Sequence, residues 1–382
     1  MNPDREVVEL LAELSAIDSA NPSLLPGAAG EGKVAQRVAD WATNAGLGVE
    51  VLEGTPGRPS VLVRGRPAGE GKGRSLMLCG HLDTVPPGDM ADPWEARIDG
   101  DRIYGRGVYD MKAGLVAALI ACRDASAAGI AGEVIVAAVA DEEHASLGVQ
   151  EILAAGIRAD GAIVTEPTEL VVATAHRGFV WTEIEVVGKA AHGSRPHLGV
   201  DAILKTGPIL VALEKLNQRL RGTAHPSLGP GTLHGSLVNG GVGESTIPPS
   251  CLLTIERRTL PGETLADVEA DIESLLAGCR AADAGLKVSA RTTLAREPFE
   301  VTAGSDIERT VVAAAERTLG RPVPIGGVSY WADAAFLSAA GIPTVLFGPT
   351  GDGAHAAVEW TDLPSTVACA RALTATAIEF CR

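Results

Sequence analysis

The sequence predicts an α/β protein in which a mostly parallel, helix-covered sheet is interrupted by an inserted α+β domain. Strand-like apolar runs alternate with helical patterns in the first part of the chain and again near its end, whereas polar and apolar residues alternate within strands in the middle. The first pattern is typical of a parallel sheet buried on both faces, and the second of an antiparallel sheet with one solvated face. We therefore expect one domain at 1–177 and 295–382 and an inserted domain at 178–294.

The elements of the first domain follow from the spacing of apolar residues. Two N-terminal helices are expected at 5–17 and 31–46, the first with Val7, Leu10, Leu11 and Leu14 on one face. Apolar runs predict four strands at Ser75–Cys79, Val134–Ala140, Ala162–Thr165 and Thr344–Phe347. Helical patterns predict an Ala-rich helix at about 112–128, another near 147–155, and one that begins at Ser305.

The elements of the inserted domain have a different character. Polar–apolar alternation predicts strands at Glu183–Val187, Thr232–Val238 and Leu286–Arg291. Helices are expected at about 200–221 and 265–282. The second opens with Thr264 and Asp267, which have the spacing of a capping box.

The composition excludes several classes of partner. Asp and Glu outnumber Lys and Arg by 48 to 32, which gives a formal net charge of −16. A negative surface disfavours nucleic acid and anionic membranes. Aromatic residues make up 3% of the chain, too few for a protein that binds single strands or sugars by stacking. We expect neither a nucleic acid nor a membrane as partner.

The sequence also predicts a compartment. No segment approaches the ~20 apolar residues that span a bilayer. Charged residues such as Arg5, Glu6 and Glu9 interrupt the N-terminal apolar residues, so this segment is not a signal peptide. The six cysteines include no Cys-x-x-Cys pair and are typical of buried, reduced thiols. We therefore expect a cytoplasmic protein.

Side chains that bind metal ions follow the predicted strands of the first domain. In an open α/β sheet, sites form beyond the carboxyl ends of the strands. Three strands are followed by Gly80-His81-Leu82-Asp83, by Asp141-Glu142-Glu143 and by Glu166. The last strand is followed by a Gly-rich loop that ends at His355, and Asp110 precedes the Ala-rich helix. We expect these side chains to meet at one edge of the sheet.

The chemistry of this set indicates a metal centre. Two histidines and three carboxylates offer mixed nitrogen and oxygen ligation, which suits Zn²⁺, Co²⁺ or Mn²⁺. Two ions ~3.5–4 Å apart need a bridging carboxylate and can share an activated water. Asp83 is placed to accept the second imidazole N–H of His81 and fix its tautomer. Of the adjacent Glu142 and Glu143, one can bind metal while the other acts as general base.

Each of these residues alone has a simpler explanation. A single Asp or Glu at a strand end is usually a helix cap or a solvated loop residue, and a histidine beside a glycine is more often structural than a ligand. Glu142 and Glu143 alone would form an ordinary acidic turn. Separate explanations of this kind for every strand end at once are implausible, so we favour the metal centre.

Three segments, in this order, resemble the di-zinc aminoacylase/carboxypeptidase metallohydrolase family. They are Gly80-His81-Leu82-Asp83-Thr84-Val85-Pro86, Gly105-Arg106-Gly107-Val108-Tyr109-Asp110-Met111-Lys112 and Asp141-Glu142-Glu143. The family includes acetylornithine deacetylase, succinyl-diaminopimelate desuccinylase, glutamate-releasing carboxypeptidases, and di- and tripeptidases. The resemblance covers essentially the whole chain, and it implies a di-metal catalytic domain with an inserted lid and dimerisation domain.

The resemblance also implies roles at the metal centre. It implies five ligands for two ions, of which one carboxylate is shared: His81 with Glu166, His355 with Glu143, and Asp110 as the bridge. Glu142 would be the general base that deprotonates the bridging water and later protonates the leaving amine, and Asp83 would orient His81. The implied cofactor is two divalent metal ions per chain, zinc in the first place, with cobalt or manganese as alternatives.

The inserted domain carries two further matches. Ala191-His192-Gly193-Ser194 resembles the segment whose histidine polarises the scissile carbonyl, commonly from the partner subunit of a dimer. The stretch 256–263 resembles one whose arginine binds the free carboxylate of the substrate, and Arg258 aligns with that arginine. A salt bridge at a strand end is the simpler explanation of Arg258. The resemblance thus implies a homodimer formed through the inserted domain.

Two positions concern further contacts with substrate. After Gly240-Gly241 the family often has an asparagine that helps to bind substrate, and this chain has Ser245, whose side chain reaches less far. Gly353 lies in a Gly-rich loop that lacks the Lys-Ser/Thr of a phosphate cradle. We expect Gly353 to let the backbone approach the substrate near His355.

The predicted function is a di-zinc amidohydrolase that cleaves an N-acyl-amino acid with a free carboxylate, by a metal-bridging hydroxide with Glu142 as the base. A dipeptidase or carboxypeptidase acting on short peptides is the alternative within the same mechanism. A non-catalytic protein that uses the metal site for binding is the alternative of another class. The presence of all the ligands and of Glu142 disfavours this last alternative.

Overall fold

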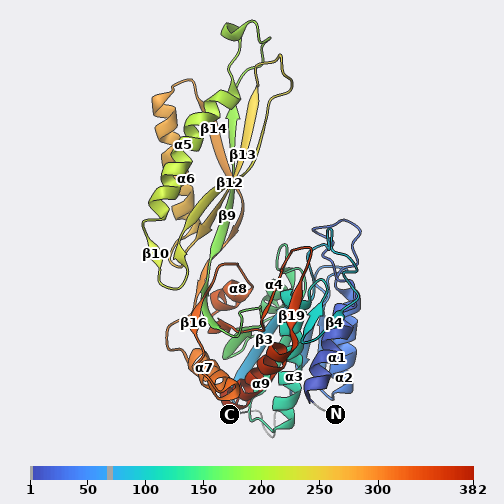
Figure 1. Cartoon of the computed structure of the whole chain (residues 1–382). Helices are drawn as coiled ribbons and strands as arrows, with labels where there is room; N and C mark the ends of the chain where they lie inside the picture. The colour runs from blue at the N-terminus through green and yellow to red at the C-terminus, as the bar shows by residue number, and fades with distance from the viewer. Residues whose placement is uncertain (1–2, 67–71) are drawn as a thin grey trace. The chain divides into compact units, whose positions relative to one another are not determined.

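The segments with alternating strands and helices form one unit of the chain, and the segment with polar–apolar alternation forms another (Figure 1). The computed structural model describes residues 3–66 and 72–382. The first unit comprises Met1–Thr174, Val301–Gly327 and Ala332–Arg382, and the second comprises Ala175–Glu300 and Val328–Trp331. The inserted domain expected at 178–294 falls within the second unit.

Parallel strands form the centre of the sheet of the first unit. In spatial order they are β6 (Glu133–Val139), β3 (Ser75–His81), β7 (Gly161–Val164) and β17 (Thr344–Leu346). Their aliphatic side chains are buried, as expected of a sheet covered on both faces. Antiparallel strands flank this centre: β1 (Gly48–Leu52) and β2 (Ser60–Arg64) beside β6, and β8 (Val172–His176) beside β17. The predicted α/β fold with a mostly parallel sheet is confirmed.

Helices cover this sheet. Three of them pack together, α3 (Ala113–Ala127), α7 (Asp306–Leu319) and α9 (Leu363–Phe380), with α1 (Pro3–Ser15) against α3 and α9. The predicted apolar face of α1 is buried at all four positions. Other helices lie against the strands elsewhere: α2 (Gly32–Asn44) on β1 and β2, α4 (Leu147–Ala154) on β6, and α8 (Ala334–Ala339) on β7 and β17. Helix α9 was not predicted, although it provides much of this packing.

A second, small sheet of the first unit was also not predicted. Its antiparallel order is β18 (Gly351–Asp352), β19 (Trp360–Asp362), β5 (Arg102–Tyr104) and β4 (Arg97–Asp99). Strands this short carry no detectable periodicity. The sheet nevertheless joins the segment that leads to Asp110 with the segment that follows His355.

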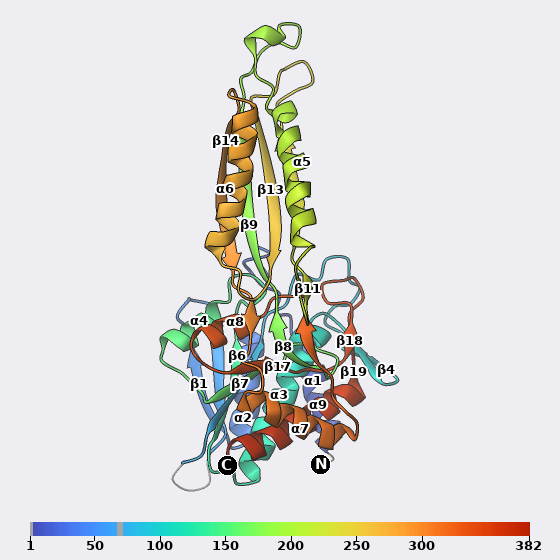
Figure 2. The same cartoon turned by 90° about the vertical axis from the view of Figure 1, so that its left-hand side faces the viewer.

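The second unit is a four-stranded antiparallel sheet with two helices on one face (Figure 2). The strand order is β12 (Thr232–Gly240), β13 (Ser250–Thr259), β9 (Gly178–Val187) and β14 (Lys287–Arg296). The helices are α5 (Ala202–Leu220) and α6 (Leu265–Ala282), and the predicted capping box of Thr264 and Asp267 is present at the start of α6. A core of aliphatic side chains from α5, α6 and the inner sheet face holds the unit together.

Within 3–66 and 72–382, no helix combines the length and apolar character needed to cross a membrane. All six cysteines are free thiols, and five of them are buried.

Candidate metal centre

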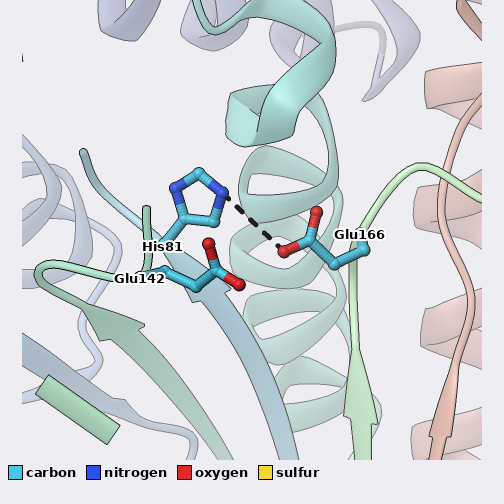
Figure 3. A group of neighbouring side chains, drawn as sticks. All are labelled: His81, Glu142 and Glu166. Carbon is cyan, nitrogen blue, oxygen red and sulfur yellow. Dashed lines mark ion pairs between the residues drawn. The ribbon is translucent and has the colours of Figure 1, made fainter. Parts of the chain in front are cut away.

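The carboxyl ends of three neighbouring strands bring the first group of side chains together (Figure 3). His81 ends β3, Glu142 follows β6, and Glu166 follows β7. Because β3 pairs with β6 on one side and with β7 on the other, these side chains emerge next to one another. One ligand atom from each lies within 4.8 Å of the others.

Asp110 lies between two histidines. Its Oδ1 is 3.1 Å from Nε2 of His81, and its Oδ2 is 3.3 Å from Nε2 of His355. Each histidine has a glutamate of its own. Nε2 of His81 is 3.7 Å from Oε1 of Glu166, and Nε2 of His355 is 3.1 Å from Oε2 of Glu143. The structure thus brings all five predicted ligands together, with Asp110 in the position of a shared ligand.

These residues fit divalent cations. Two imidazoles and three carboxylates form the mixed nitrogen and oxygen set expected of a zinc, cobalt or manganese site. The Oε1 atom of Glu143 is buried and has no hydrogen-bond partner among the described residues. A buried carboxylate oxygen without a partner is costly, and a bound cation would satisfy it.

The ionisable side chains of the site shift one another's pKa values. Hydrogen bonds to Asp110 and Glu143 raise the pKa of His355 to about 10. Burial alone would favour neutral His81, but the hydrogen bond to Asp110 and the charge of Glu166 outweigh it, and the pKa of His81 lies well above its usual range. Burial in turn raises the pKa of Glu166. Protons on the histidines and metal ions therefore compete for the same carboxylates.

Glu142 is suited to move a proton. Burial, together with the charge of Glu166, raises the pKa of Glu142 well above its usual range, although the charge of His81 opposes this rise. Its carboxylate accepts no hydrogen bond from the described residues. A carboxylate with a raised pKa and unused oxygen atoms beside a metal site is typical of a general base.

The hydrogen bonds of Asp83 differ from those that we expected. We expected its carboxylate to accept the imidazole N–H of His81. Nδ1 of His81 lies instead 2.8 Å from the main-chain oxygen of Asp83 and 3.7 Å from the nearer carboxylate oxygen. The carboxylate accepts hydrogen bonds from the main-chain N–H groups of Glu142 and Glu143, at 3.1 and 3.2 Å. Asp83 therefore orients the histidine through its main chain and the Glu142–Glu143 turn through its side chain.

A buried polar network that contacts this turn was not predicted from the sequence. Asn21 donates from Nδ2 to Asp83 at 2.7 Å and to Asp141 at 3.0 Å. Arg58 donates from Nη2 to Asp141 at 2.7 Å and to Glu31 at 2.6 Å. The five residues come from separate segments, and for three of them, namely Asn21, Glu31 and Arg58, the sequence held no signal. The network fixes the turn that carries Glu142 and Glu143.

Within the second unit, the segments that carry His192 and Ser245 pair with each other. The N–H of Gly193 donates to the main-chain oxygen of Ser245 at 2.8 Å, so two of the predicted contact residues are neighbours. The N–H of Ser194 lies 3.2 Å from Nδ1 of His192. Because Nδ1 accepts this bond, the neutral imidazole carries its proton on Nε2 and can donate it.

Arg258 forms the salt bridge that was its simpler explanation. Its Nε donates to Glu256 at 2.5 Å, and its guanidinium carbon lies 5.3 Å from the ring centre of Phe179. Glu256 also accepts a hydrogen bond from Trp181 at 2.7 Å. Among the described residues, no partner engages the two Nη groups of Arg258. These contacts fix the side chain and leave the edge that can pair with a carboxylate open.

Gly353 has a structural role that needs no substrate. Its φ is +84°, and a Cβ atom at this position would lie 1.9 Å from the main-chain oxygen of Val358. Its carbonyl accepts a hydrogen bond from the N–H of Ala356 at 2.9 Å, which closes the turn that carries His355. Glycine is therefore required here by the turn itself.

Known proteins resemble this chain in sequence and in fold. The sequence profile of the peptidase family M20/M25/M40 matches residues 77–379. An acetylornithine deacetylase from Vibrio campbellii is 34% identical over 271 residues, which cover 69% of this chain and 70% of that protein. The aminopeptidase PepT of Bacillus cereus has a similar structure, with a TM-score of 0.81 and 19% identity over 99% of both chains. A dinuclear metal-binding peptidase of the M20 family from Bacillus subtilis matches with a TM-score of 0.75 and 14% identity over 99% of this chain and 98% of that one.

Proposed function

The chain belongs to the peptidase family M20/M25/M40 and is a metal-dependent hydrolase, and we propose that it uses two metal ions to remove the acyl group from an N-acyl-amino acid. The observation that carries the proposal is the position of Asp110, whose two carboxylate oxygens face His81 and His355 at 3.1 and 3.3 Å. A carboxylate shared in this way is what a pair of ions requires. The Bacillus subtilis peptidase is described as dinuclear, which supports two ions per chain.

We propose zinc as the resident ion, held by His81 and Glu166 on one side of Asp110 and by His355 and Glu143 on the other. A divalent cation in this place supplies Lewis-acid activation of water and of the amide carbonyl. Glu142 takes the proton of the attacking water and delivers it to the leaving amine nitrogen, so that the products are a carboxylate and a free amino acid. Asp83 keeps this base in place through the main-chain N–H of Glu142.

Arg258 and the relatives support this substrate class. The two unengaged Nη groups of Arg258 suit the α-carboxylate of an amino acid. The relative from Vibrio campbellii is named acetylornithine deacetylase, which supports an N-acyl-amino acid over a peptide. His192, which can donate from Nε2, would stabilise the negative charge that develops on the carbonyl oxygen of the substrate.

A panel of N-acetyl-amino acids and dipeptides tests this substrate class. We expect the zinc-loaded enzyme to have its highest kcat/KM on N-acetyl-amino acids with a free carboxylate and to lose activity on their methyl esters. Arg258→Lys should mainly raise KM, because lysine keeps the charge but loses the paired contact. Faster cleavage of dipeptides would instead identify the protein as a dipeptidase. Equal rates on methyl esters and free acids would show that Arg258 does not bind the substrate carboxylate.

We also propose that the protein is a homodimer formed through the second unit. Strand β12 lies at the edge of its sheet, and Leu237 and Val238 on this strand are 69% and 68% exposed. Beside it, α5 exposes four apolar residues at helical spacing: Ile203, Leu204, Leu210 and Val211. An open strand edge next to an apolar helix face favours a second copy of the same surface as its partner.

A charge on this surface is expected to dissociate the dimer. Val238→Glu should convert a dimeric mass to a monomeric mass in size-exclusion chromatography with light scattering, because the buried charge would have no partner. Val51→Glu is the matched control, since Val51 is 52% exposed on β1, an edge strand of the first unit. A wild-type protein that is monomeric at micromolar concentration would refute the proposal.

If His192 acts across the dimer, the mixture of two inactive variants should regain activity. Glu142→Ala and His192→Ala chains that exchange subunits form mixed dimers, each with one site that has both residues. Recovery would support action across the dimer, and its failure despite subunit exchange would place His192 at the site of its own chain.

A further inference from the structure

The small sheet of the first unit sets two metal-site loops side by side. Strand β5 pairs antiparallel with β19, so that Tyr104 lies opposite Trp360. In such a pair, the residues that follow one strand face the residues that precede the other. The segment after β5 leads to Asp110, and the segment before β19 contains His355. The topology therefore brings the loop of the shared ligand against the loop of a terminal ligand.

Glu359 is the side chain through which the first of these loops is held. It is buried, and its carboxylate accepts three main-chain hydrogen bonds: from Gly107 at 3.1 Å, from Tyr109 at 3.0 Å and from Asp110 at 3.1 Å. The third donor is the N–H of the shared ligand itself. A carboxylate with four lone-pair positions can satisfy these donors together, whereas a neutral amide would present a donor of its own to one of them.

Arg106, a residue of the first loop, binds two residues of the second loop. Its Nη1 donates to Oε2 of Glu359 at 2.6 Å, and both side chains are at most 2% exposed. Its Nη2 donates to the main-chain oxygen of Ala356, the neighbour of His355, at 2.8 Å. The planar guanidinium thus spans the two loops with one rigid group, which a lysine cannot do.

We infer that Arg106 and Glu359 form a clasp that positions the metal ligands Asp110 and His355 without touching a metal ion. This inference rests on the proposed two-metal site. His81 lies on a buried central strand, but His355 lies in a loop, with 55% of its side chain exposed. The ion on the His355 side therefore depends most on the clasp. Neither residue was assigned a role from the sequence.

The number and affinity of bound ions test the clasp directly. We expect Glu359→Gln and Arg106→Lys to weaken the binding of at least one zinc ion by about 10- to 100-fold, as loss of a group that orients ligands does. Equilibrium dialysis against graded Zn²⁺ with elemental analysis gives both quantities. The thermal midpoint of the metal-free variants measures their folding separately. If Glu359→Gln does not fold, the result for Arg106→Lys decides.

A matched substitution separates this effect from general destabilisation. Glu263 of the second unit also accepts hydrogen bonds from a buried arginine, Arg257, and from a main-chain N–H, that of Leu260. Glu263→Gln should therefore lower stability without changing zinc affinity. Variants of the clasp that bind two ions as tightly as the wild type would overturn the inference even if they melt earlier. A wild-type protein that binds fewer than two ions would instead overturn the proposed function.

Discussion

Replacing Glu142 with alanine is expected to lower kcat by about 10²–10⁴, the usual contribution of a general acid–base group. Glu142 lies beside His81 and Glu166 at the carboxyl ends of β3, β6 and β7, and its carboxylate has no hydrogen-bond partner among the described residues. In the proposed reaction no other carboxylate of the site is available for proton transfer. Asp110, Glu143 and Glu166 hold the ions, and the carboxylate of Asp83 accepts the main-chain hydrogen bonds of the Glu142–Glu143 turn. Glu142→Gln should be equally inactive, since the amide keeps the shape but cannot take the proton.

Steady-state kinetics and elemental analysis of the same preparations test this assignment. We expect both Glu142 variants to retain two ions per chain, and Glu95→Ala, an exposed carboxylate of the same unit, to keep wild-type activity. Loss of a metal ion from Glu142→Ala would reassign the residue as a ligand. Activity near that of the wild type would show that Glu142 is not the general base.

Removing the metal ions with a chelator should abolish activity, and rebinding of zinc at pH 7 should release at least one proton per chain. The reason is the pKa of His355, which Asp110 and Glu143 raise to about 10 in the metal-free protein. This histidine is protonated at pH 7 and has to lose its proton to bind metal. Zinc affinity should therefore increase from pH 6 towards pH 10, where the proton is lost without the metal.

Isothermal titration calorimetry in two buffers of different ionisation enthalpy measures these protons. The observed enthalpy of zinc binding should differ between the buffers in proportion to the number of protons released. Asp110→Asn is a useful comparison, because it removes one of the carboxylates that hold the proton on His355 together with the shared ligand. Zinc binding with no buffer dependence at pH 7 would contradict the role of His355.

The convergence of the predicted ligands could be foreseen because simple topology governs it. His81 ends a strand, and Glu142, Glu143 and Glu166 lie in the loops that follow neighbouring strands. Neighbouring parallel strands place their carboxyl ends at the same edge of a sheet. This convergence could therefore be predicted without knowing the exact length or spatial order of the strands. Asp110 and His355 were predicted from a motif and from loop position, and the structure places them close to each other.

The groups that support the ligands were not predictable in the same way. The carboxylate of Asp83 contacts the main chain of Glu142 and Glu143, and main-chain partners leave no trace in the residue types of a sequence. Arg106 and Glu359 are 253 residues apart and meet because strands of three residues pair. Such strands are too short for periodicity to reveal them. Long-range polar contacts of this kind became visible only in three dimensions.

Anomalous diffraction from crystals of the zinc-loaded protein, recorded at the zinc absorption edge, is the most direct test of the two-metal site. We expect two peaks per chain, ~3.5–4 Å apart, on the two sides of the Asp110 carboxylate. His81 and Glu166 should bind one ion, and His355 and Glu143 the other, with Glu142 outside bonding distance of both. A single peak, or a pair of peaks that Asp110 does not bridge, would contradict the account.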